Sequence, residues 1–175
     1  MPGTSQTSWG AFLRLFARGA DGIRVALDWE GLGTLHRAGH ARIVRADSVL
    51  TGRRPPCDYY APWYADPSGR PTDYRAADAR PLCHADLSAH GQGLTADQRE
   101  RVGYFERALA TQTTRLCLPT LDLGGGRCLV LDGNHRLIAA LRLAAAGTPR
   151  RISEFRVTLP LDRSLLPDLR HWVAD

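Results

Sequence analysis

The spacing of apolar residues predicts two helices in the second half of the chain. Residues 95–112 are expected to form the first, with Thr95 as the N-cap and Gln98 at the capping-box position. The glutamates of this helix are expected to pair with arginines on the same charged face. Residues 135–146 carry a broad apolar face, which implies packing against a core, and Gly147 is suited to end that helix.

Short apolar runs on either side of a glycine-rich turn predict strands in the same half. Residues 115–121 and 127–131 flank three consecutive glycines at 124–126, which is the pattern of a tight β-hairpin. Residues 152–159 are expected to form a further strand, and residues 164–173 a last helix capped by its first serine.

The first half of the chain is less regular. Residues 1–8 are predicted to be disordered, and apolar residues at helical spacing predict a helix over residues 9–18 and a shorter one over 29–36. Residues 41–50 alternate with a period of two, as a strand does. Residues 51–93 are rich in Pro, Gly, Asp and aromatic side chains and are predicted to form a long irregular stretch with a functional role.

The mixed order of helices and strands predicts an α+β fold in which flanking helices cover a mixed sheet. A length of 175 residues suits one domain with one core, and we place that domain at residues 41–175. Residues 1–40 are expected to be an N-terminal helical extension, which serves packing or a possible homodimer.

The chain has 23 arginines and no lysine. A codon preference for arginine explains this bias, but the lack of lysine still excludes a P-loop lysine, a pyridoxal Schiff base and a lysine nucleophile. Any phosphate has to be held by Arg, His, backbone amides or a metal ion. Arginine does this well, because its planar guanidinium matches two phosphate oxygens at once.

The net charge of +5 favours anionic partners such as nucleotides, phosphorylated metabolites or nucleic acid. Because the basic residues are spread along the chain, a nucleic-acid partner is possible but not favoured. The four cysteines lack metal-finger spacing, and neither a secretory signal nor an apolar stretch of membrane-spanning length is visible. We therefore expect a cytoplasmic protein with reduced, mostly buried thiols and no membrane association.

A phosphate-binding turn is predicted at residues 131–136, where a buried strand runs into a helix. Backbone amides at a helix N-terminus favour a bound phosphate. Gly133 gives the turn its conformational freedom, and Asn134 can cap the helix. His135 and Arg136 stand in the first turn, where the helix dipole disfavours positive charge. A basic pair in that position is accounted for if an anion binds there.

Asp132 ends the strand, and its carboxylate is a candidate ligand for a magnesium ion that bridges phosphates. The same carboxylate is suited to cap the helix or to pair with an arginine. His135, taken by itself, is as consistent with a structural histidine as with a ligand of the phosphate.

Other candidate groups lie outside this turn. The aromatic residues at 59–64 either stack on a base or substrate or form a small satellite core. Cys57 with Cys83 and His84 is a weak candidate zinc site, because its spacing is irregular. The arginine pair at 53–54 either reaches a phosphate or stays solvated.

Residues 130–140, VLDGNHRLIAA, resemble the signature of the ParB/sulfiredoxin superfamily. In that superfamily a strand leads into an Asp-Gly-His-His-Arg-type or Gly-Cys-His-Arg-type turn and then into an alanine-rich helix. The preceding hairpin and the early strand at 42–50 fit the same pattern. The resemblance implies a small ParB/sulfiredoxin-like domain in which residues 133–136 bind the phosphates of ATP, or else of ADP or CTP. It also implies that Asp132 serves a bound Mg²⁺.

The sequence departs from each activity of that superfamily. Sulfiredoxins need a cysteine where this chain has Asn134, so reduction of a sulfinic acid is excluded. Chromosome-partitioning ParB proteins carry a helix-turn-helix domain and a dimerisation domain, for which this chain is too short. The free serine kinase type is nearest by motif, but it places a catalytic Glu shortly after the first strand. Residues 51–63 contain no Glu, so Asp58 is the candidate general base.

We therefore expect an ATP-dependent phosphotransferase or nucleotide hydrolase, a small-molecule kinase or ATPase, that acts on a hydroxylated metabolite such as an amino acid. Its catalytic residues are predicted to be Asp132, His135 and Asp58. Two alternatives stay open. One is a nucleotide-responsive or nucleic-acid-binding module without turnover, and the other is a biosynthetic enzyme that uses the phosphate pocket for another substrate.

Overall fold

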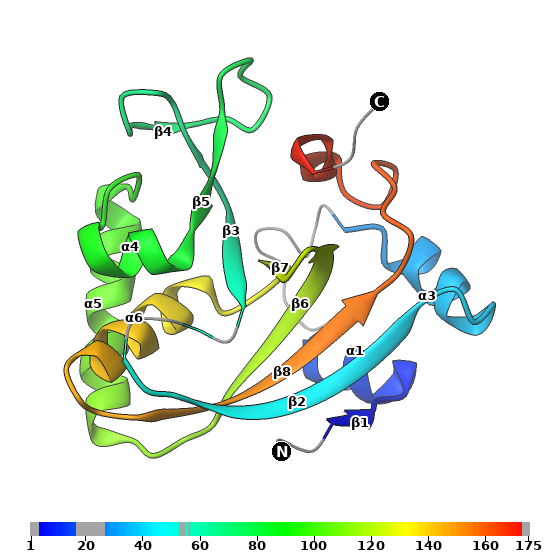
Figure 1. Ribbon diagram of the computed structural model, residues 1–175, viewed down its shortest axis with the longest axis horizontal. Coiled ribbons are helices and arrows are strands. Elements are labelled where there is room, and N and C mark those ends of the chain that lie inside the picture. The colour runs from blue at the N-terminus through cyan, green and yellow to red at the C-terminus, as the bar shows by residue number, and fades with distance from the viewer. Residues whose placement is uncertain (1–3, 17–26, 53–54, 56, 173–175) are drawn as a thin grey trace.

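The computed structural model describes residues 4–16, 27–52, 55 and 57–172, and the following elements belong to them (Figure 1). The strands are β1 (Thr4–Gln6), β2 (Arg42–Leu50), β3 (Asp58–Ala65), β4 (Pro71–Thr72), β5 (Arg80–Cys83), β6 (Leu116–Gly124), β7 (Arg127–Val130) and β8 (Arg150–Thr158). The helices are α1 (Trp9–Phe16), α3 (Trp29–Arg37), α4 (His84–His90), α5 (Ala96–Thr111) and α6 (Asn134–Ala145), followed by a 3₁₀ helix at Pro167–His171.

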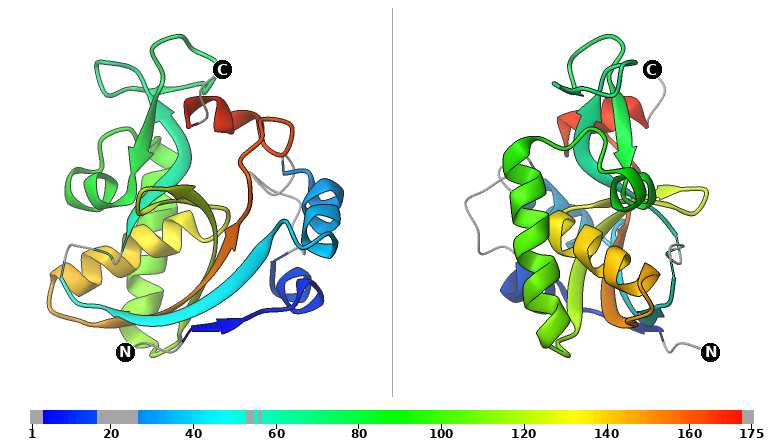
Figure 2. Two further views of the ribbon diagram at one scale, coloured as in Figure 1. Left: turned by 45° about the vertical axis from the view of Figure 1, so that its right-hand side comes forward. Right: turned by 90° about the vertical axis from the view of Figure 1, so that its left-hand side faces the viewer.

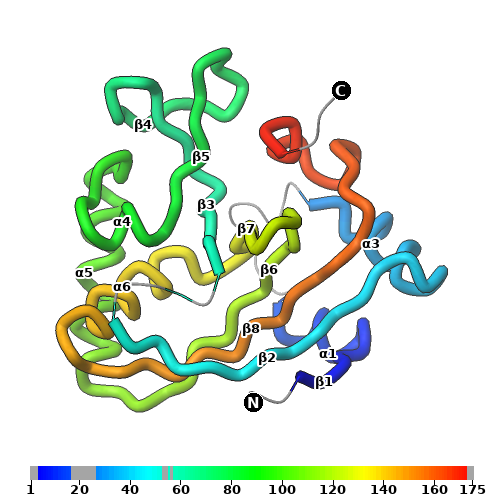
Figure 3. Tube along the Cα trace, in the orientation of Figure 1, coloured from blue at the N-terminus to red at the C-terminus, as the bar shows by residue number. Residues whose placement is uncertain are grey.

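The strands form one mixed sheet in the order β1-β2-β8-β6-β7-β3-β4, and β5 also pairs with β3. β2 and β8 form a long antiparallel ladder, whereas β6 lies parallel to β8 and β3 lies parallel to β7. In the trace of Figure 3, β3 and β7 lie side by side although residues 66–126 separate them along the chain. A mixed sheet with flanking helices agrees with the α+β class expected from the sequence.

Hydrophobic side chains pack on both faces of the sheet. One core lies between the sheet and α4, α5 and α6, and the other between the sheet, α1, α3 and the C-terminal segment. β7 serves both cores, because Cys128 and Val130 belong to the first and Leu129 to the second. Figure 2 shows α5 (green) beside α6 (yellow). α6 is buried along most of its length, so the core holds its N-terminus in place.

Elements with a strong local signal are confirmed. The capping box of α5 is present: the Gln98 amide donates to the Thr95 hydroxyl at 3.2 Å, and the Thr95 amide donates to the Gln98 side chain at 2.8 Å. The glycine-rich hairpin joins β6 to β7, and α6 ends before Gly147, which has a φ of +87°. α1 is described as far as Phe16, and the last two residues of that predicted helix lie outside the described part of the chain.

The prediction of one long irregular stretch over residues 51–93 is wrong, because its described part contains β3, β5 and α4. Both faces of β3 are covered, so its apolar run does not alternate. Pro62 lies within this strand, and a proline is uncommon there because it has no amide hydrogen to donate. The pairing of β3 with β5 shifts register between Tyr60 and Tyr64, and such an irregularity accommodates a residue that has no amide hydrogen.

Two predictions at the chain ends also fail. Thr4–Gln6 forms an edge strand on β2 instead of a disordered segment, and residues 1–3 lie outside the described part. All three of its side chains are exposed, so no apolar pattern marks this strand. Near the other end, the 3₁₀ helix begins after Leu166 and not at Ser164, whose amide donates to the Asp162 carboxylate at 2.8 Å.

Candidate functional site

The predicted phosphate-binding turn joins β7 to α6. The Leu131 amide donates to the Pro119 carbonyl at 2.9 Å, which continues the sheet up to the turn. Gly133 then adopts a left-handed conformation with a φ of +84° and is the N-cap of α6. The Leu137 amide donates to the Gly133 carbonyl at 2.8 Å and so begins the helix. The turn is as sharp as predicted and requires glycine at its centre.

Asn134 does not cap the helix as predicted, because it is the first helical residue and follows the cap. Its side-chain amide donates back to the Val130 carbonyl at 3.3 Å, and only 8% of the residue is exposed. The Asn134 Oδ1 atom has no hydrogen-bond partner among the described residues. A buried acceptor of this kind is costly unless a ligand, an ion or a water molecule completes it.

We expect Gly133→Ala to lower the free energy of unfolding by about 2 kcal/mol. An L-residue in the left-handed conformation costs roughly 1–2 kcal/mol. The added Cβ would also lie 3.2 Å from a Leu118 methyl group and 3.3 Å from the Arg136 guanidinium. Gly147→Ala is the matched control, because it has the same type of conformation with open space around it. Urea unfolding should show a larger loss of unfolding free energy for Gly133→Ala than for Gly147→Ala. Equal losses would contradict close contacts of the Gly133 position with Leu118 and Arg136.

A cavity of about 430 Å³ opens beside the turn. Three segments that are distant in the sequence line it, namely β3, α5 and the β7–α6 turn. The lining residues are Pro62, Trp63, Arg101, Phe105, Leu131, Asp132, Gly133, Asn134, His135 and Arg136. This volume lies in the range of small-molecule sites. The structure therefore gathers the whole predicted motif around one cavity.

The charged groups of the cavity are two arginines and one aspartate. Arg136 Nη2 lies 3.0 Å from Asp132 Oδ2, one helical turn away, so pairing with an arginine is one observed role of this carboxylate. Arg101 brings a second guanidinium from α5. Two positive charges against one negative charge give the cavity a positive balance, which suits an anionic ligand.

His135 is held against an aromatic wall. Its ring centroid lies 4.9 Å from that of Trp63. Burial lowers the pKa of His135 below its ordinary value of 6.5, and the positive charge of Arg101 lowers it further. The imidazole is therefore neutral at neutral pH, and its buried Nε2 has no hydrogen-bond partner in the part of the chain described. A neutral imidazole has one nitrogen that can accept a proton.

His84 lies behind the turn and is completely buried. Its Nδ1 is 3.2 Å from the Tyr59 carbonyl oxygen, so Nδ1 carries the ring proton and donates it. Burial lowers the pKa of His84 to about 4. The ring also lies beside the Asn134 side chain, but His84 Nε2 makes no hydrogen bond of good geometry with any described residue. His84 thus connects the start of α4 to β3 and lies beside the first residue of α6.

The structure does not bring Asp58 into the site. β3 runs parallel to β7, with Asp58 opposite Arg127 at the start of both strands. The turn follows the other end of β7, beside Pro62 and Trp63. Asp58 is exposed and does not line the cavity. Its predicted role as general base therefore has no place in this site.

The aromatic residues of β3 divide between the two faces of the sheet. Trp63 borders the cavity, whereas the Tyr59 hydroxyl donates to Glu154 at 3.1 Å inside the first core. The Tyr64 hydroxyl donates to Asp168 at 3.0 Å in the C-terminal segment. Tyr59 and Tyr64 therefore belong to the packed interior, and stacking on a base or substrate stays a prediction for Trp63.

The predicted zinc site of Cys57, Cys83 and His84 does not form among the described residues. His84 donates to a backbone carbonyl, and the Cys57 thiol lies beside Cys128 instead. Residues 53–54 lie outside the described part of the chain, so the arginine pair has no place assigned here.

Sequence reasoning missed Arg101 and Phe105 as parts of the site. The sequence predicts that the glutamates of α5 pair with arginines of the same helix, but Glu106 pairs with Arg142 of α6 at 3.6 Å, and Arg101 lines the cavity. Arg101 and Phe105 are four residues apart and therefore share a face of α5. This spacing could have indicated that Arg101 and Phe105 lie on one face of α5, but it does not indicate which element that face contacts.

A larger cavity of about 600 Å³ lies between α3 and residues 160–165. It is bordered by the carboxylates of Asp28, Glu30 and Asp162 and by no arginine. Asp28 already accepts from the Gly31 amide at 2.9 Å as the N-cap of α3. An acidic lining repels phosphate, so the cavity at the turn is the candidate functional site.

Comparisons of the chain with protein-family models, curated proteins and solved structures give no match. The resemblance of residues 130–140 to the ParB/sulfiredoxin superfamily therefore stays a prediction that rests on one motif and its context. Among the described helices, none is long and apolar enough to cross a membrane.

Proposed function

We propose that the cavity beside the β7–α6 turn binds the phosphates of a nucleotide, ATP in the first instance. The observation that carries this proposal is the start of α6, where the Gly133 N-cap and the first helical residues line the same cavity as Arg101 and Arg136. Helix amides, a positive dipole end and arginines together form a phosphate site. Because the chain has no lysine, the helix amides and these two arginines are the groups best placed to bind phosphate.

We propose further that the protein is a phosphotransferase or nucleotide hydrolase for a small hydroxylated metabolite such as an amino acid. Arg136 and Arg101 neutralise phosphate oxygens, and the Asp132 carboxylate orients the Arg136 guanidinium. Trp63 and Phe105 supply apolar walls on which a base or an acceptor can pack.

The residues of the cavity also fit Mg²⁺. This ion prefers oxygen ligands and bridges carboxylates to phosphates. The Asp132 carboxylate supplies such an oxygen in the cavity lining. Asn134, another lining residue, carries a second oxygen in its buried Oδ1, which has no hydrogen-bond partner among the described residues. A bound Mg²⁺ would neutralise charge on the phosphates during transfer.

His135 replaces Asp58 as the proposed general base. The acceptor hydroxyl oxygen would attack the terminal phosphorus, and the bond from that phosphorus to the nucleotide diphosphate oxygen would break. The hydroxyl proton would pass to the neutral His135 imidazole, whose buried Nε2 has no hydrogen-bond partner among the described residues. Burial, Arg101 and the Trp63 ring keep that imidazole neutral and in place. In hydrolysis, water takes the place of the acceptor.

The alternative of a nucleotide-responsive module without turnover is favoured by one observation. Asp132 is the only carboxylate among the described residues that line the cavity, and it is paired with Arg136. Binding without nucleotide consumption, whatever acceptor is supplied, would favour this alternative. Turnover with one acceptor class would exclude it.

We expect Arg136→Ala to weaken nucleotide binding roughly 10- to 150-fold, which corresponds to the loss of a charge-assisted contact of about 1.5–3 kcal/mol. Calorimetry with ATP, ADP and CTP, with and without Mg²⁺, measures this. Arg151→Ala is the matched control, because Arg151 is exposed on β8 and does not line the cavity. No binding of any of these compounds by the wild type, or equal losses in both variants, would contradict the proposal.

A further inference from the structure

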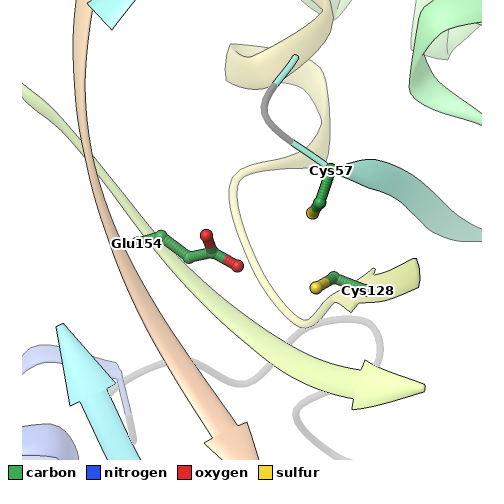
Figure 4. Close-up of side chains that lie close together, drawn as sticks. All are labelled: Cys57, Cys128 and Glu154. Atoms are coloured by element: carbon green, nitrogen blue, oxygen red, sulfur yellow. The ribbon is translucent and has the colours of Figure 1, made fainter. Parts of the chain in front are cut away.

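Two thiols and a carboxylate converge at a second place, away from the cavity. Cys57 precedes β3, Cys128 lies in β7 and Glu154 lies in β8. One ligand atom from each lies within 4.8 Å of the other two. Figure 4 shows the Cys57 and Cys128 sulfurs and the Glu154 carboxylate directed toward a common space. The parallel pairing of β3 with β7, which places Tyr59 opposite Cys128, brings the two cysteines together.

The Glu154 carboxylate is buried and rigidly held. It accepts from the Thr120 hydroxyl at 2.7 Å, from the Tyr59 hydroxyl at 3.1 Å, and from Arg156 at 3.0 and 2.9 Å. Only 3% of Glu154 is exposed, and Arg156 offsets its charge. A ligating carboxylate is commonly fixed by such donors, which orient it toward a metal.

We propose that Cys57, Cys128 and Glu154 bind a thiophilic divalent cation, with Zn²⁺ as the best fit. Zn²⁺ binds thiolate sulfur at about 2.3 Å and carboxylate oxygen at about 2.0–2.2 Å, and atoms within 4.8 Å of one another can share one such ion. Thiolates select Zn²⁺ over Mg²⁺ or Ca²⁺. To reach the ion, one Glu154 oxygen exchanges a hydrogen bond, such as that from Tyr59, for the metal.

Charge balance supports the same cation. Two thiolates neutralise one divalent ion, and Glu154 with Arg156 already forms a neutral pair. The buried cluster therefore stays neutral when an ion replaces two thiol protons. Three protein ligands leave a fourth position for water. Such an ion would tie the segment before β3 to the neighbouring strands, independently of the nucleotide proposal.

Co²⁺ titration of the reduced full chain tests this site. We expect one Co²⁺ per chain, with thiolate-to-cobalt charge-transfer absorption in the near ultraviolet that Zn²⁺ displaces. Cys57→Ser should weaken binding at least about 10-fold, and Glu154→Gln should weaken it as well. Cys83→Ser and Cys117→Ser are matched controls, because both thiols lie outside the cluster, and these variants should bind as the wild type does.

Cys57 is only partly buried, so Cys57→Ser should fold, and circular dichroism checks that it does. Absence of the charge-transfer band in the wild type would overturn the proposal. Equal binding by Cys57→Ser, or a loss of binding in Cys117→Ser, would do the same. If Cys57 and Cys128 form a disulfide in the purified protein that resists reduction and Co²⁺ does not bind, the pair is structural and not a metal site.

Discussion

Lowering the pH from about 7 to about 4 is expected to reduce the free energy of unfolding by about 3 kcal/mol through His84 alone. His84 is completely buried, and burial is the main reason why its pKa falls from 6.5 to about 4. The Tyr59 carbonyl and the Asn134 side chain favour the protonated ring, but they do not offset the burial.

The sign follows from the two pKa values. Between about pH 4 and pH 6.5 the unfolded chain protonates His84 while the folded chain keeps it neutral. The unfolded state then binds more protons, so stability is complete above pH 6.5 and is lost as the pH falls toward 4. His135 acts in the same direction, because its pKa is also lowered. Asp47, Asp66 and Asp162 have pKa values below 3.8, so their contributions disappear only at lower pH.

Urea unfolding of the wild type and of His84→Gln across this pH range measures the effect. The glutamine amide can still donate to the Tyr59 carbonyl but does not titrate, so the variant should lose much less stability on acidification. His40→Gln is the control, since His40 is exposed. If the variant unfolds too readily, NMR titration of His84 in the wild type gives its pKa directly. A His84 pKa near 6.5 would contradict the prediction.

The elements that could be predicted from sequence are those defined by neighbouring residues. Thr95 and Gln98 mark the start of α5 because both halves of a capping box lie within one turn. The glycines at 124–126 mark a hairpin because all three adopt positive φ. The turn around Gly133 belongs to the same class, since the residues predicted to bind phosphate there are consecutive in the chain.

The rest depends on contacts between distant segments. β3 is recognisable as a strand only when its parallel partner β7 and its register shift around Pro62 are known. The same pairing decides which residues reach the turn, placing Trp63 beside it and Asp58 at the opposite end. Arg101 enters the site through the packing of α5 on α6, which no local pattern indicates.

Nucleotide turnover is expected to be abolished by Asp132→Asn, which is the largest effect we predict on activity. The amide can keep the hydrogen bond from Arg136, now seen at 3.0 Å, so the turn should stay intact. Under the proposed function, the substitution removes the charge that would hold Mg²⁺ beside the phosphates, and phosphoryl transfer depends mostly on positioning and charge neutralisation. Without Mg²⁺, this variant should therefore bind nucleotide as tightly as the wild type does.

His135→Gln should lower kcat about 10²- to 10⁴-fold, as the loss of a general base does. Turnover by the wild type should also fall with decreasing pH, at a pKa below 6.5, because the buried imidazole must be neutral to accept a proton. Asp58→Asn is the matched control and should leave turnover unchanged, since Asp58 lies at the far end of β3.

A nucleotide-consumption screen over serine, threonine, homoserine and sugar alcohols compares the four proteins. Full activity of Asp132→Asn would exclude the metal role, because an amide oxygen carries no charge with which to replace the carboxylate. Loss of activity in Asp58→Asn with retention in His135→Gln would return the base role to Asp58 and would require β3 to move relative to β7. A different outcome is that no acceptor stimulates nucleotide consumption, while the wild type still binds nucleotide and Arg136→Ala binds it more weakly. In that case the cavity senses nucleotide without consuming it. The same two arginines would then hold a ligand that is released unchanged.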